Sequence, residues 1–355
     1  MLKPPALGKG DLICVIAPAS PPEEAALDIG CRYLKMRGFK VRKTPSNFDM
    51  FRSYLAAPDE RRKRDLLDAL CDPNVDAVFC ARGGYGCLRL LDLEPPPVPK
   101  IFLGYSDITT LHLVLNRKMV TFHGPMVASN FAEIDPFTEE NLWQMLTAPK
   151  LCPLPHPDEL PPPRTIYPGR CEGILCGGNL SLVAASLGTQ YEIDTCGKIL
   201  LLEEVDEPTY KVDRMLRHLY LAGKLQKAAG IVFGYSPTIF PQEEFFQLLG
   251  ELAALKIPIL YGLAFGHGTP KLTIPLGVLA QLNASEGQLS LLEAPVIEKS
   301  TLWSKSQPAR PAAKRLKQKA ATIYQGLKEP VPKEKLTSGS RFITGSNRAS
   351  NLPTR

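Results

Sequence analysis

The sequence of 355 residues has no run of eighteen or more apolar residues, so it predicts no helix that spans a membrane. Its first residues, Met1-Leu2-Lys3-Pro4-Pro5, carry one basic side chain, and no apolar segment follows before Leu12. This start differs from a secretory signal, and we expect a cytoplasmic protein. No Cys-x-x-Cys pair is matched by a second Cys or His pair, so we expect no structural zinc.

The nine cysteines are an odd number, and most lie in apolar stretches such as Leu12-Ile13-Cys14-Val15-Ile16. We therefore expect small buried thiols rather than a disulfide framework. The net charge of +6 arises near the C-terminus, because residues 301–355 contain 12 Lys and Arg against 2 Asp and Glu. Residues 1–300 contain 30 basic and 34 acidic side chains, so the body of the chain is mildly acidic.

Short apolar runs alternate with amphipathic segments in the first third of the chain. This pattern predicts strands at residues 11–17, 38–42, 75–81 and 101–104, and helices at residues 21–34, 58–71 and 86–91. Such alternation predicts an α/β fold, in which an N-terminal parallel sheet of flavodoxin-like or Rossmann-like type carries helices on both faces.

The alternation stops at about Asp135, and residues 151–168 hold seven prolines, which neither a helix nor a central strand tolerates. We therefore predict a first domain at residues 1–134, a proline-rich linker at 135–168 and a second, smaller α/β domain at 169–299. From residue 300 onward Lys, Arg, Ser, Pro and Thr dominate, and we expect a basic, disordered tail over 300–355. A solvated extension is favoured for this tail over a contact with nucleic acid, which its charge would also allow.

The segment Phe102-Leu103-Gly104-Tyr105-Ser106-Asp107 places a serine between a predicted strand and a helix that starts near Ile108. A serine at such a turn faces outward beside free backbone amides, which suits a nucleophile whose oxyanion is held by N–H groups. The spacing alone is equally compatible with a serine that caps the helix.

A nucleophilic serine needs a base, and the base needs an orienting acid. Of the five histidines, His156 in the proline-rich segment and His218 beside a helical arginine are expected to be solvated, and His112 is expected to pack inside a helix. His123 in Phe-His-Gly-Pro and His267 in Gly-His-Gly remain. The flanking glycines favour His267 and leave His123 as the alternative.

Candidate acids stand at the end of the apolar run Leu200-Leu201-Leu202, where Glu203 and Glu204 follow each other. Because side chains alternate along a strand, these two carboxylates point to opposite faces, and only one can enter a given cleft. A strand end that reaches water is the other interpretation of this pair.

Six short motifs occur in a fixed order along the chain: Arg82-Gly83-Gly84-Tyr85-Gly86, Gly104-Tyr105-Ser106-Asp107, His123-Gly124-Pro125-Met126, Gly177-Gly178-Asn179-Leu180, Leu202-Glu203-Glu204 and Gly266-His267-Gly268. Taken together, they resemble the LD-carboxypeptidase family of serine peptidases, which also contains the microcin-immunity peptidases. The resemblance extends from about Asp11 to about Leu292.

The resemblance implies a triad in which Ser106 attacks, His267 transfers the proton and Glu203 orients the imidazole. These residues fall in both predicted domains, so the active site is expected in the cleft between them. The resemblance also implies a homodimer and a reaction without metal or organic cofactor.

The loop Arg82-Gly83-Gly84-Tyr85-Gly86 lacks the spacing of phosphate-binding loops, and its glycines could simply serve tight turns. In the family this loop approaches the nucleophile. The resemblance therefore implies an oxyanion hole formed by the N–H groups of Gly84 and Asp107. It also implies substrate contacts from Tyr85 and from Arg82, whose guanidinium suits a substrate carboxylate.

The implied activity is hydrolysis of the L,D-peptide bond to a terminal D-amino acid of a cytoplasmic muropeptide, with release of D-alanine during cell-wall recycling or remodelling. A microcin-immunity-type peptidase that cleaves peptidyl-nucleotide conjugates is one alternative. An aromatic pair able to stack a nucleobase would favour this alternative, and the sequence shows no clear pair beside these motifs. The other alternative is a non-catalytic binding protein on the same scaffold.

Overall fold

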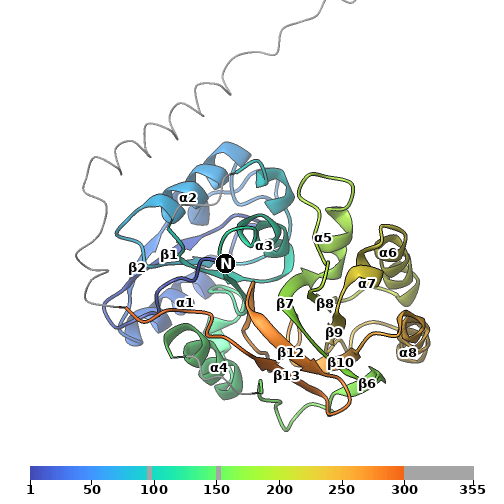
Figure 1. The fold of residues 1–355 in the computed structure, drawn as a ribbon. Coiled ribbons are helices and arrows are strands. Elements are labelled where there is room, and N and C mark those ends of the chain that lie inside the picture. Colours follow the sequence, from blue (N-terminus) through green and yellow to red (C-terminus); the bar gives the residue numbers. More distant parts are fainter. Residues whose placement is uncertain (94–97, 149–152, 300–355) are drawn as a thin grey trace, which may run out of the picture. The chain divides into compact units, whose positions relative to one another are not determined.

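Two β-sheets with helices packed on them make up the part of the chain that the computed structural model describes, which is residues 1–93, 98–148 and 153–299 (Figure 1). Both sheets belong to one compact unit. The basic tail predicted at 300–355 lies outside the described residues.

The first sheet has six strands in the order β11-β5-β4-β3-β1-β2. All neighbours pair in parallel except β11, which runs antiparallel to β5. The parallel part has the strand order 2-1-3-4-5 of flavodoxin-like sheets, so the predicted class of this sheet is confirmed. The strands are β1 (Leu12–Ile16), β2 (Lys40–Lys43), β3 (Ala77–Cys80), β4 (Ile101–Gly104), β5 (Thr121–His123) and β11 (Ile274–Leu276).

Helices cover both faces of this sheet, because successive side chains of β1 point to opposite sides. Ile13 and Val15 share a buried cluster with residues of α1 (Glu24–Met36) and α4 (Pro136–Thr147). Cys14 and Ile16 share another with residues of α2 (Asp59–Cys71) and α3 (Thr109–Leu115). The helix predicted at 86–91 is a short 3-10 helix, η2 (Cys87–Leu90); the other 3-10 helices here are η1 (Pro45–Phe48), η3 (Ser106–Ile108) and η4 (Phe131–Glu133).

The second sheet has seven strands in the order β13-β12-β7-β8-β9-β10-β6. Its central strands β7 to β10 are parallel, and the flanking strands β12, β13 and β6 pair antiparallel. The strands are β6 (Arg164–Tyr167), β7 (Arg170–Asn179), β8 (Ile199–Glu203), β9 (Gly230–Gly234), β10 (Ile259–Leu263), β12 (Leu279–Asn283) and β13 (Gln288–Leu291). The helical elements are α5 (Leu180–Ala185), α6 (Thr209–Leu221), α7 (Lys224–Lys227), α8 (Gln242–Glu251) and η5 (Leu252–Leu255).

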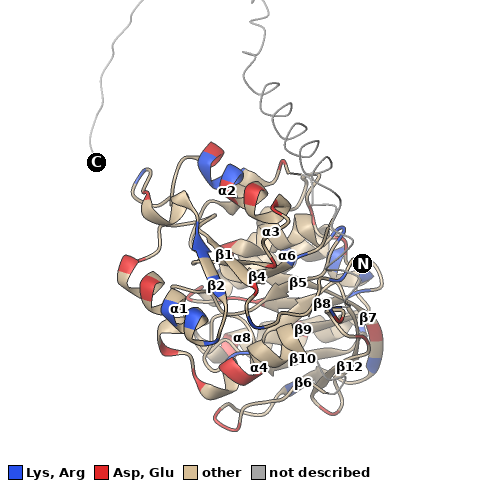
Figure 2. Ribbon diagram, turned by 90° about the vertical axis from the view of Figure 1, so that its left-hand side faces the viewer, with Lys and Arg blue, Asp and Glu red and all other residues tan. Residues whose placement is uncertain are grey.

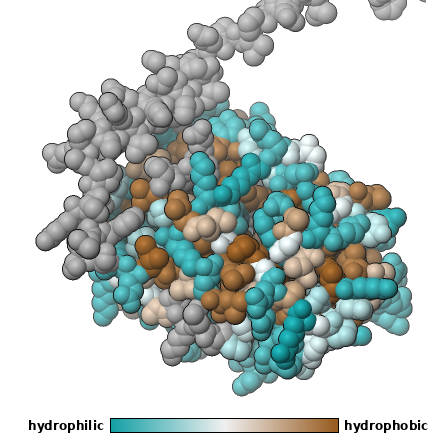
Figure 3. Space-filling model, in the orientation of Figure 1, coloured by the Kyte–Doolittle hydropathy of each residue, from teal (hydrophilic) through white to brown (hydrophobic). Residues whose placement is uncertain are grey.

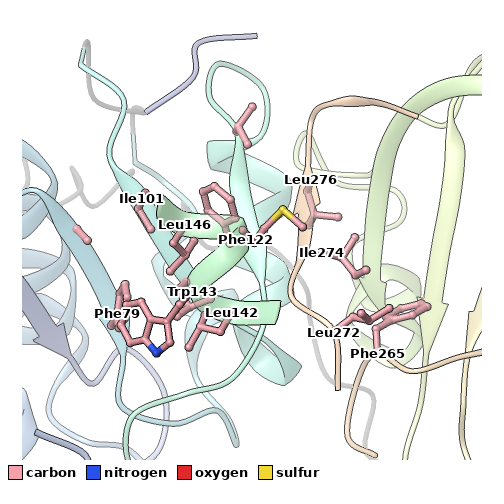
Figure 4. Packing of buried hydrophobic residues seen from close by; sticks show 14 of the residues in the cluster. Phe79, Ile101, Phe122, Leu142, Trp143, Leu146, Phe265, Leu272, Ile274 and Leu276 are labelled. Carbon is pink, nitrogen blue, oxygen red and sulfur yellow. The ribbon is translucent and has the colours of Figure 1, made fainter. Parts of the chain in front are cut away.

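Two strands connect segments that the sequence pattern separates. β6 lies within the proline-rich segment and pairs with β10 at the sheet edge, where a chain with few N–H donors can still be accommodated. β11 comes from the C-terminal half of the chain and completes the first sheet beside β5. Its side chains Ile274 and Leu276 join the same buried cluster as Phe122 of β5 (Figure 4). The two halves of the molecule thus share core packing.

The described surface carries charged residues of both signs. Both signs of charge occur on α1 and α2: in α1 the acidic residues come first and the basic ones last, and in α2 a basic run lies between acidic residues (Figure 2). On the face shown in Figure 3, hydrophobic residues lie in small groups between hydrophilic ones. Among the described residues, no helix has the length and apolar character that crossing a bilayer requires.

Candidate active site

Ser106 occupies the sharp turn that leads from β4 into η3 and α3. Its φ of +64° is in the left-handed region, which a residue with a side chain adopts at a cost of about 1–3 kcal/mol. The helix-cap interpretation of this serine is wrong, because Ser106 is the first residue of η3 and the cap of α3 is Ile108. A strained, half-buried serine at a strand-to-helix turn is typical of a nucleophile elbow.

The loop after β3 packs against this turn. A Cβ atom built on Gly83 would lie 3.1 Å from the Oγ of Ser106 and 3.4 Å from the backbone N of Asp107, so glycine permits the close approach. The next residue, Gly84, has a φ of +110°. The Asp107 side chain is buried and accepts a hydrogen bond from the N–H of Cys87 at 2.8 Å. The residues expected to form the oxyanion hole, Gly84 and Asp107, therefore belong to two backbone segments that meet beside Ser106.

Glu203, the last residue of β8, and His267, in the loop after β10, form a direct pair. The Nδ1–H of His267 donates to Oε2 of Glu203 at 2.7 Å. The carboxylate is 2% exposed and the imidazole 22%. A Cβ atom on Gly266 would stand 2.5 Å from the same Oε2, so the glycine before the histidine leaves room for the carboxylate.

The carboxylate is held in its ionised form. Burial by itself would raise the pKa of Glu203, but the facing imidazoles of His123 and His267 outweigh it and lower this pKa to about 2. An ionised acceptor at Oε2 fixes the proton of His267 on Nδ1, which leaves Nε2 as a proton acceptor.

The imidazole and the serine turn lie next to each other. Tyr105, the residue before Ser106, has its ring centroid 4.9 Å from that of His267 in an edge-to-face contact. The carboxyl ends of the parallel strands of both sheets meet here, because β4 leads to Ser106 while β8 and β10 lead to Glu203 and His267. This is the edge at which open α/β sheets bind their ligands.

Glu204 points away from this pair, as strand alternation predicts. Its carboxylate accepts hydrogen bonds from the backbone N–H and the hydroxyl of Ser181, at 2.8 and 2.6 Å, and from the amide of Asn179 at 3.0 Å. Asn179 in turn caps α5 by accepting from the N–H of Leu182. Glu204 therefore anchors the start of α5.

The other histidines lie as follows. His112 is 1% exposed and bonds the carbonyl of Gly104 through Nε2 at 2.8 Å, which agrees with a packing role. His218 is exposed, and the half-buried His156 bonds the carbonyl of Pro161. His123, the alternative base, does not reach the solvent and lies on the far side of Glu203, with Nε2 at 3.8 Å from Oε1.

Sequence reasoning missed Lys271, which lies 3% exposed beside the site. Its ammonium stands 4.4 Å from the centroid of the Tyr105 ring and 3.4 Å from the Tyr105 hydroxyl. Burial lowers the pKa of Lys271 to about 8, against the opposing attraction of Glu203 and Asp135. A lysine directly before the mostly apolar segment Leu272–Leu276 is the sequence signal that could have indicated it.

An aromatic pair that cannot be recognised in the sequence includes a residue of the loop after β3. The exposed rings of Tyr54 and Tyr85 meet edge to face with centroids 5.5 Å apart. The Ser20 hydroxyl joins them, because it donates to the carbonyl of Tyr54 at 2.8 Å and accepts from the N–H of Tyr85 at 3.1 Å. The expectation that no aromatic pair flanks the motifs is wrong. Arg82, in the same loop, is exposed.

The described residues contain no group of three or more His, Cys, Asp or Glu side chains able to hold a metal ion. A serine in a strained turn beside a carboxylate-bound imidazole is the arrangement found in serine hydrolases, and these features place the chain in that class.

Comparison with known proteins identifies the family. Residues 13–124 match the model of the LD-carboxypeptidase N-terminal domain, and residues 172–282 match that of the C-terminal domain. The chain is 39% identical over 310 residues to a probable murein peptide carboxypeptidase of Bacillus subtilis, which covers 83% of this chain and 96% of the relative. The chain therefore belongs to the LD-carboxypeptidase family and is a serine-type hydrolase of the carboxypeptidase class.

Solved structures share the fold. The muramoyltetrapeptide carboxypeptidase of Oxalobacter formigenes matches with a TM-score of 0.67 and 31% identity over 79% of this chain and 97% of that one. The structure of MccF in complex with glutamyl sulfamoyl guanosine matches with a TM-score of 0.77 and 21% identity over 84% of this chain and all of that one. At 21% identity, the similarity to MccF shows a shared fold alone.

Proposed function

We propose that the protein is a muropeptide LD-carboxypeptidase, in which Ser106, His267 and Glu203 hydrolyse the L,D-peptide bond to a terminal D-alanine. The observation that carries the proposal is the 2.7 Å bond between Glu203 and His267, with the imidazole beside Tyr105 and hence beside the serine turn. The names of the B. subtilis and O. formigenes relatives support a murein peptide as the substrate.

In this mechanism His267 Nε2 accepts the Ser106 proton as Oγ attacks the carbonyl carbon of the scissile bond. The resulting oxyanion receives hydrogen bonds from the N–H groups of Gly84 and Asp107. The imidazolium, stabilised by the carboxylate of Glu203, then protonates the leaving amine of D-alanine. Water enters next, His267 removes its proton, and hydrolysis of the ester returns Ser106 and releases the tripeptide.

The exposed Arg82 is proposed to bind the carboxylate of the terminal D-alanine. It stands one residue before Gly83, whose backbone lies beside the Ser106 side chain, so the Arg82 backbone is close to the nucleophile. The guanidinium itself donates to the carbonyl of Pro21 at 3.4 Å. An arginine recognises a carboxylate through two parallel hydrogen bonds, which would distinguish a free chain end from an internal peptide bond. Tyr85, three residues further, is proposed as a second substrate contact.

The test is incubation of the purified full chain with a murein tetrapeptide, followed by mass spectrometry for the tripeptide and D-alanine. Ser106→Ala is expected to lower the rate by up to about 10⁶-fold, as serine deletions in triads do. Circular dichroism should show that the variant keeps its fold. A wild-type chain that releases no D-alanine, or a variant that keeps full activity, would overturn the proposal.

A second candidate is cleavage of peptidyl-nucleotide conjugates, and the Tyr54–Tyr85 pair favours it because exposed tyrosine rings can stack on a nucleobase. Aspartyl sulfamoyl adenosine is a suitable probe. If this candidate holds, Tyr54→Ala should raise the KM for the probe several-fold while hydrolysis of the free tetrapeptide stays unchanged. Equal KM values for wild type and variant would contradict it.

Action on cytoplasmic recycling intermediates and assembly as a homodimer belong to the same proposal. Both follow from the family resemblance. Light scattering coupled to size exclusion would test the dimer, and fractionation of cells that express the full chain would test the compartment.

A further inference from the structure

The second oxygen of the Glu203 carboxylate has an unusual environment. Oε2 is bound to His267, but Oε1 is fully buried and accepts no hydrogen bond from the described residues. A buried carboxylate oxygen without a donor is costly, since each unmet hydrogen bond of a charged group costs more than about 1–3 kcal/mol. The polar atom that faces Oε1 is Nε2 of His123, at 3.8 Å.

His123 has no other polar contact that would explain its burial. It ends β5, is 2% exposed, and among the described residues neither of its ring nitrogens has a hydrogen-bond partner. Its ring contacts the rings of Tyr105 and Phe265 with centroids 5.9 Å apart in each case. The imidazole is therefore held in place by rings, with Nε2 directed at the carboxylate.

The charged and titratable groups around His123 come from four elements. Glu203 faces it from β8, and Tyr105 from the turn after β4. His112 of α3 lies 6.3 Å away by ring centroids, and burial lowers the pKa of His112 to about 3, so this neighbour stays neutral. Lys271, in the loop between β10 and β11, is 3% exposed and places its ammonium 4.4 Å from the centroid of the Tyr105 ring.

We propose that His123 is a positioning residue for the Glu203 carboxylate: its Nε2–H faces Oε1 and keeps Oε2 turned toward His267. The carboxylate thus lies between two imidazoles with different tasks. His267 exchanges protons with the substrate, and His123 orients the acid from the rear.

The distance of 3.8 Å between Nε2 of His123 and Oε1 of Glu203 is longer than a hydrogen bond. Hydrogen bonds in active sites are often long in the free enzyme and shorten in the complex. When His267 becomes an imidazolium, the carboxylate must keep both its charge and its direction, and a second donor restrains the rotation of the carboxylate about its terminal bond. In metal sites, a hydrogen-bond partner behind a ligating side chain is typically worth 10–100-fold in activity, and we expect the same range for a donor behind a catalytic carboxylate.

The kinetic part of this inference rests on the proposed function and uses two variants. His123→Gln keeps an N–H donor near Nε2, and His123→Phe keeps a ring without a donor. For His123→Phe we expect kcat for D-alanine release to fall about 10–100-fold with KM unchanged. Its acid limb of kcat/KM should move to lower pH, because a carboxylate that turns away from His267 stabilises the imidazolium less.

His123→Gln should stay within a few-fold of wild type in kcat and keep the wild-type pH profile. A structural role would affect both variants through packing and would leave the pH profile unchanged. Equal losses in both variants, or wild-type behaviour of His123→Phe, would overturn the inference.

A second measurement uses the wild-type chain alone and needs neither substrate nor a substitution. The chain has five histidines, so ¹⁵N–¹H correlation of the imidazoles is tractable. The inference requires that His123 of the wild-type chain carries its proton on Nε2, and a proton on Nδ1 would overturn it. Because this result does not depend on turnover, failure of the proposed substrate and failure of the His123 assignment can be told apart.

Discussion

Gly83, in the loop after β3, lies beside the side chain of Ser106, in the turn after β4. A Cβ atom on Gly83 would stand 2.9 Å from the Cβ of Ser106, a distance that side-chain carbons essentially never adopt. Gly83 has no positive φ, so alanine is compatible with its backbone and the conflict is steric alone. The nucleophile is thus positioned by a neighbouring backbone that lacks a side chain.

Gly83→Ala is therefore expected to displace Ser106 and to lower kcat about 100-fold, the usual effect of misplacing a reacting group by about 1 Å. The matched control is Gly250→Ala, where a Cβ atom meets nothing within 4 Å and the residue lies in α8. We expect the control to keep wild-type kcat. Steady-state kinetics on both variants checks this, and equal rates would show that the contact does not position the serine.

Glu203→Gln and Glu204→Gln should separate activity from stability. Glu203→Gln removes the charge that fixes the His267 tautomer, and the corresponding change in other triads lowers kcat about 10⁴-fold. Glu204→Gln loses charge-assisted bonds to Ser181, so the midpoint of thermal unfolding should fall while kcat stays within tenfold. If Glu204→Gln inactivated the enzyme as strongly, the assignment of the acid would be wrong.

The buried His112 should make the free energy of unfolding depend on pH. Burial lowers the pKa of His112 in the folded chain to about 3, whereas the unfolded residue titrates near 6.5. Between these values the unfolded state binds the additional proton, so stability falls as the pH falls, by up to about 1.4 kcal/mol per pH unit.

The measurement is urea unfolding at pH 7, 6 and 5 for the wild type and for His112→Gln, which keeps a donor for the carbonyl of Gly104. The variant should show the smaller slope. Glu203 does not interfere in this range, because its contribution is lost as the pH falls from about 4.5 to about 2. Identical slopes would mean that His112 is accessible to protons in the folded chain.

Arg62 has a fully buried side chain that forms hydrogen bonds with several loops near the site. It donates to the carbonyls of Pro18, Ala57 and Gly86 and pairs with Asp59. Arg62→Met leaves these acceptors unmet, and we expect a loss of about 3–5 kcal/mol in the free energy of unfolding. The neighbouring exposed Arg61→Met is the control and should change stability by less than about 0.5 kcal/mol in the same urea titration. Similar losses in both would contradict this account of Arg62.

Much of the first sheet could be predicted because its strands are short, buried on both faces and therefore apolar throughout. The runs at residues 11–17, 75–81 and 101–104 contain β1, β3 and β4. β11 was not predictable in the same way, since three residues after a loop carry no pattern of their own and gain their partner, β5, only in the fold. The helix predicted at 86–91 is a single 3-10 turn that follows Gly86, whose φ of +127° lies outside helical values.

For the site, local motifs indicated Ser106, the pair of acids and two candidate histidines, and the family resemblance selected among them. The Tyr54–Tyr85 contact could not be read from the sequence, because one hydroxyl, that of Ser20, brings together residues 31 positions apart. The burial of Lys271 and the short distance between His123 and Glu203 could not be predicted either, because each depends on strands that are distant in the chain.

Local sequence is enough to specify the strand-to-helix turn at Ser106 and the alternation that separates Glu203 from Glu204, since both depend on residues within a few positions of each other. Which imidazole meets which carboxylate oxygen depends on the folded chain. That choice depends on how the ends of β5, β8 and β10 converge, and pairing between strands is a property of the whole fold.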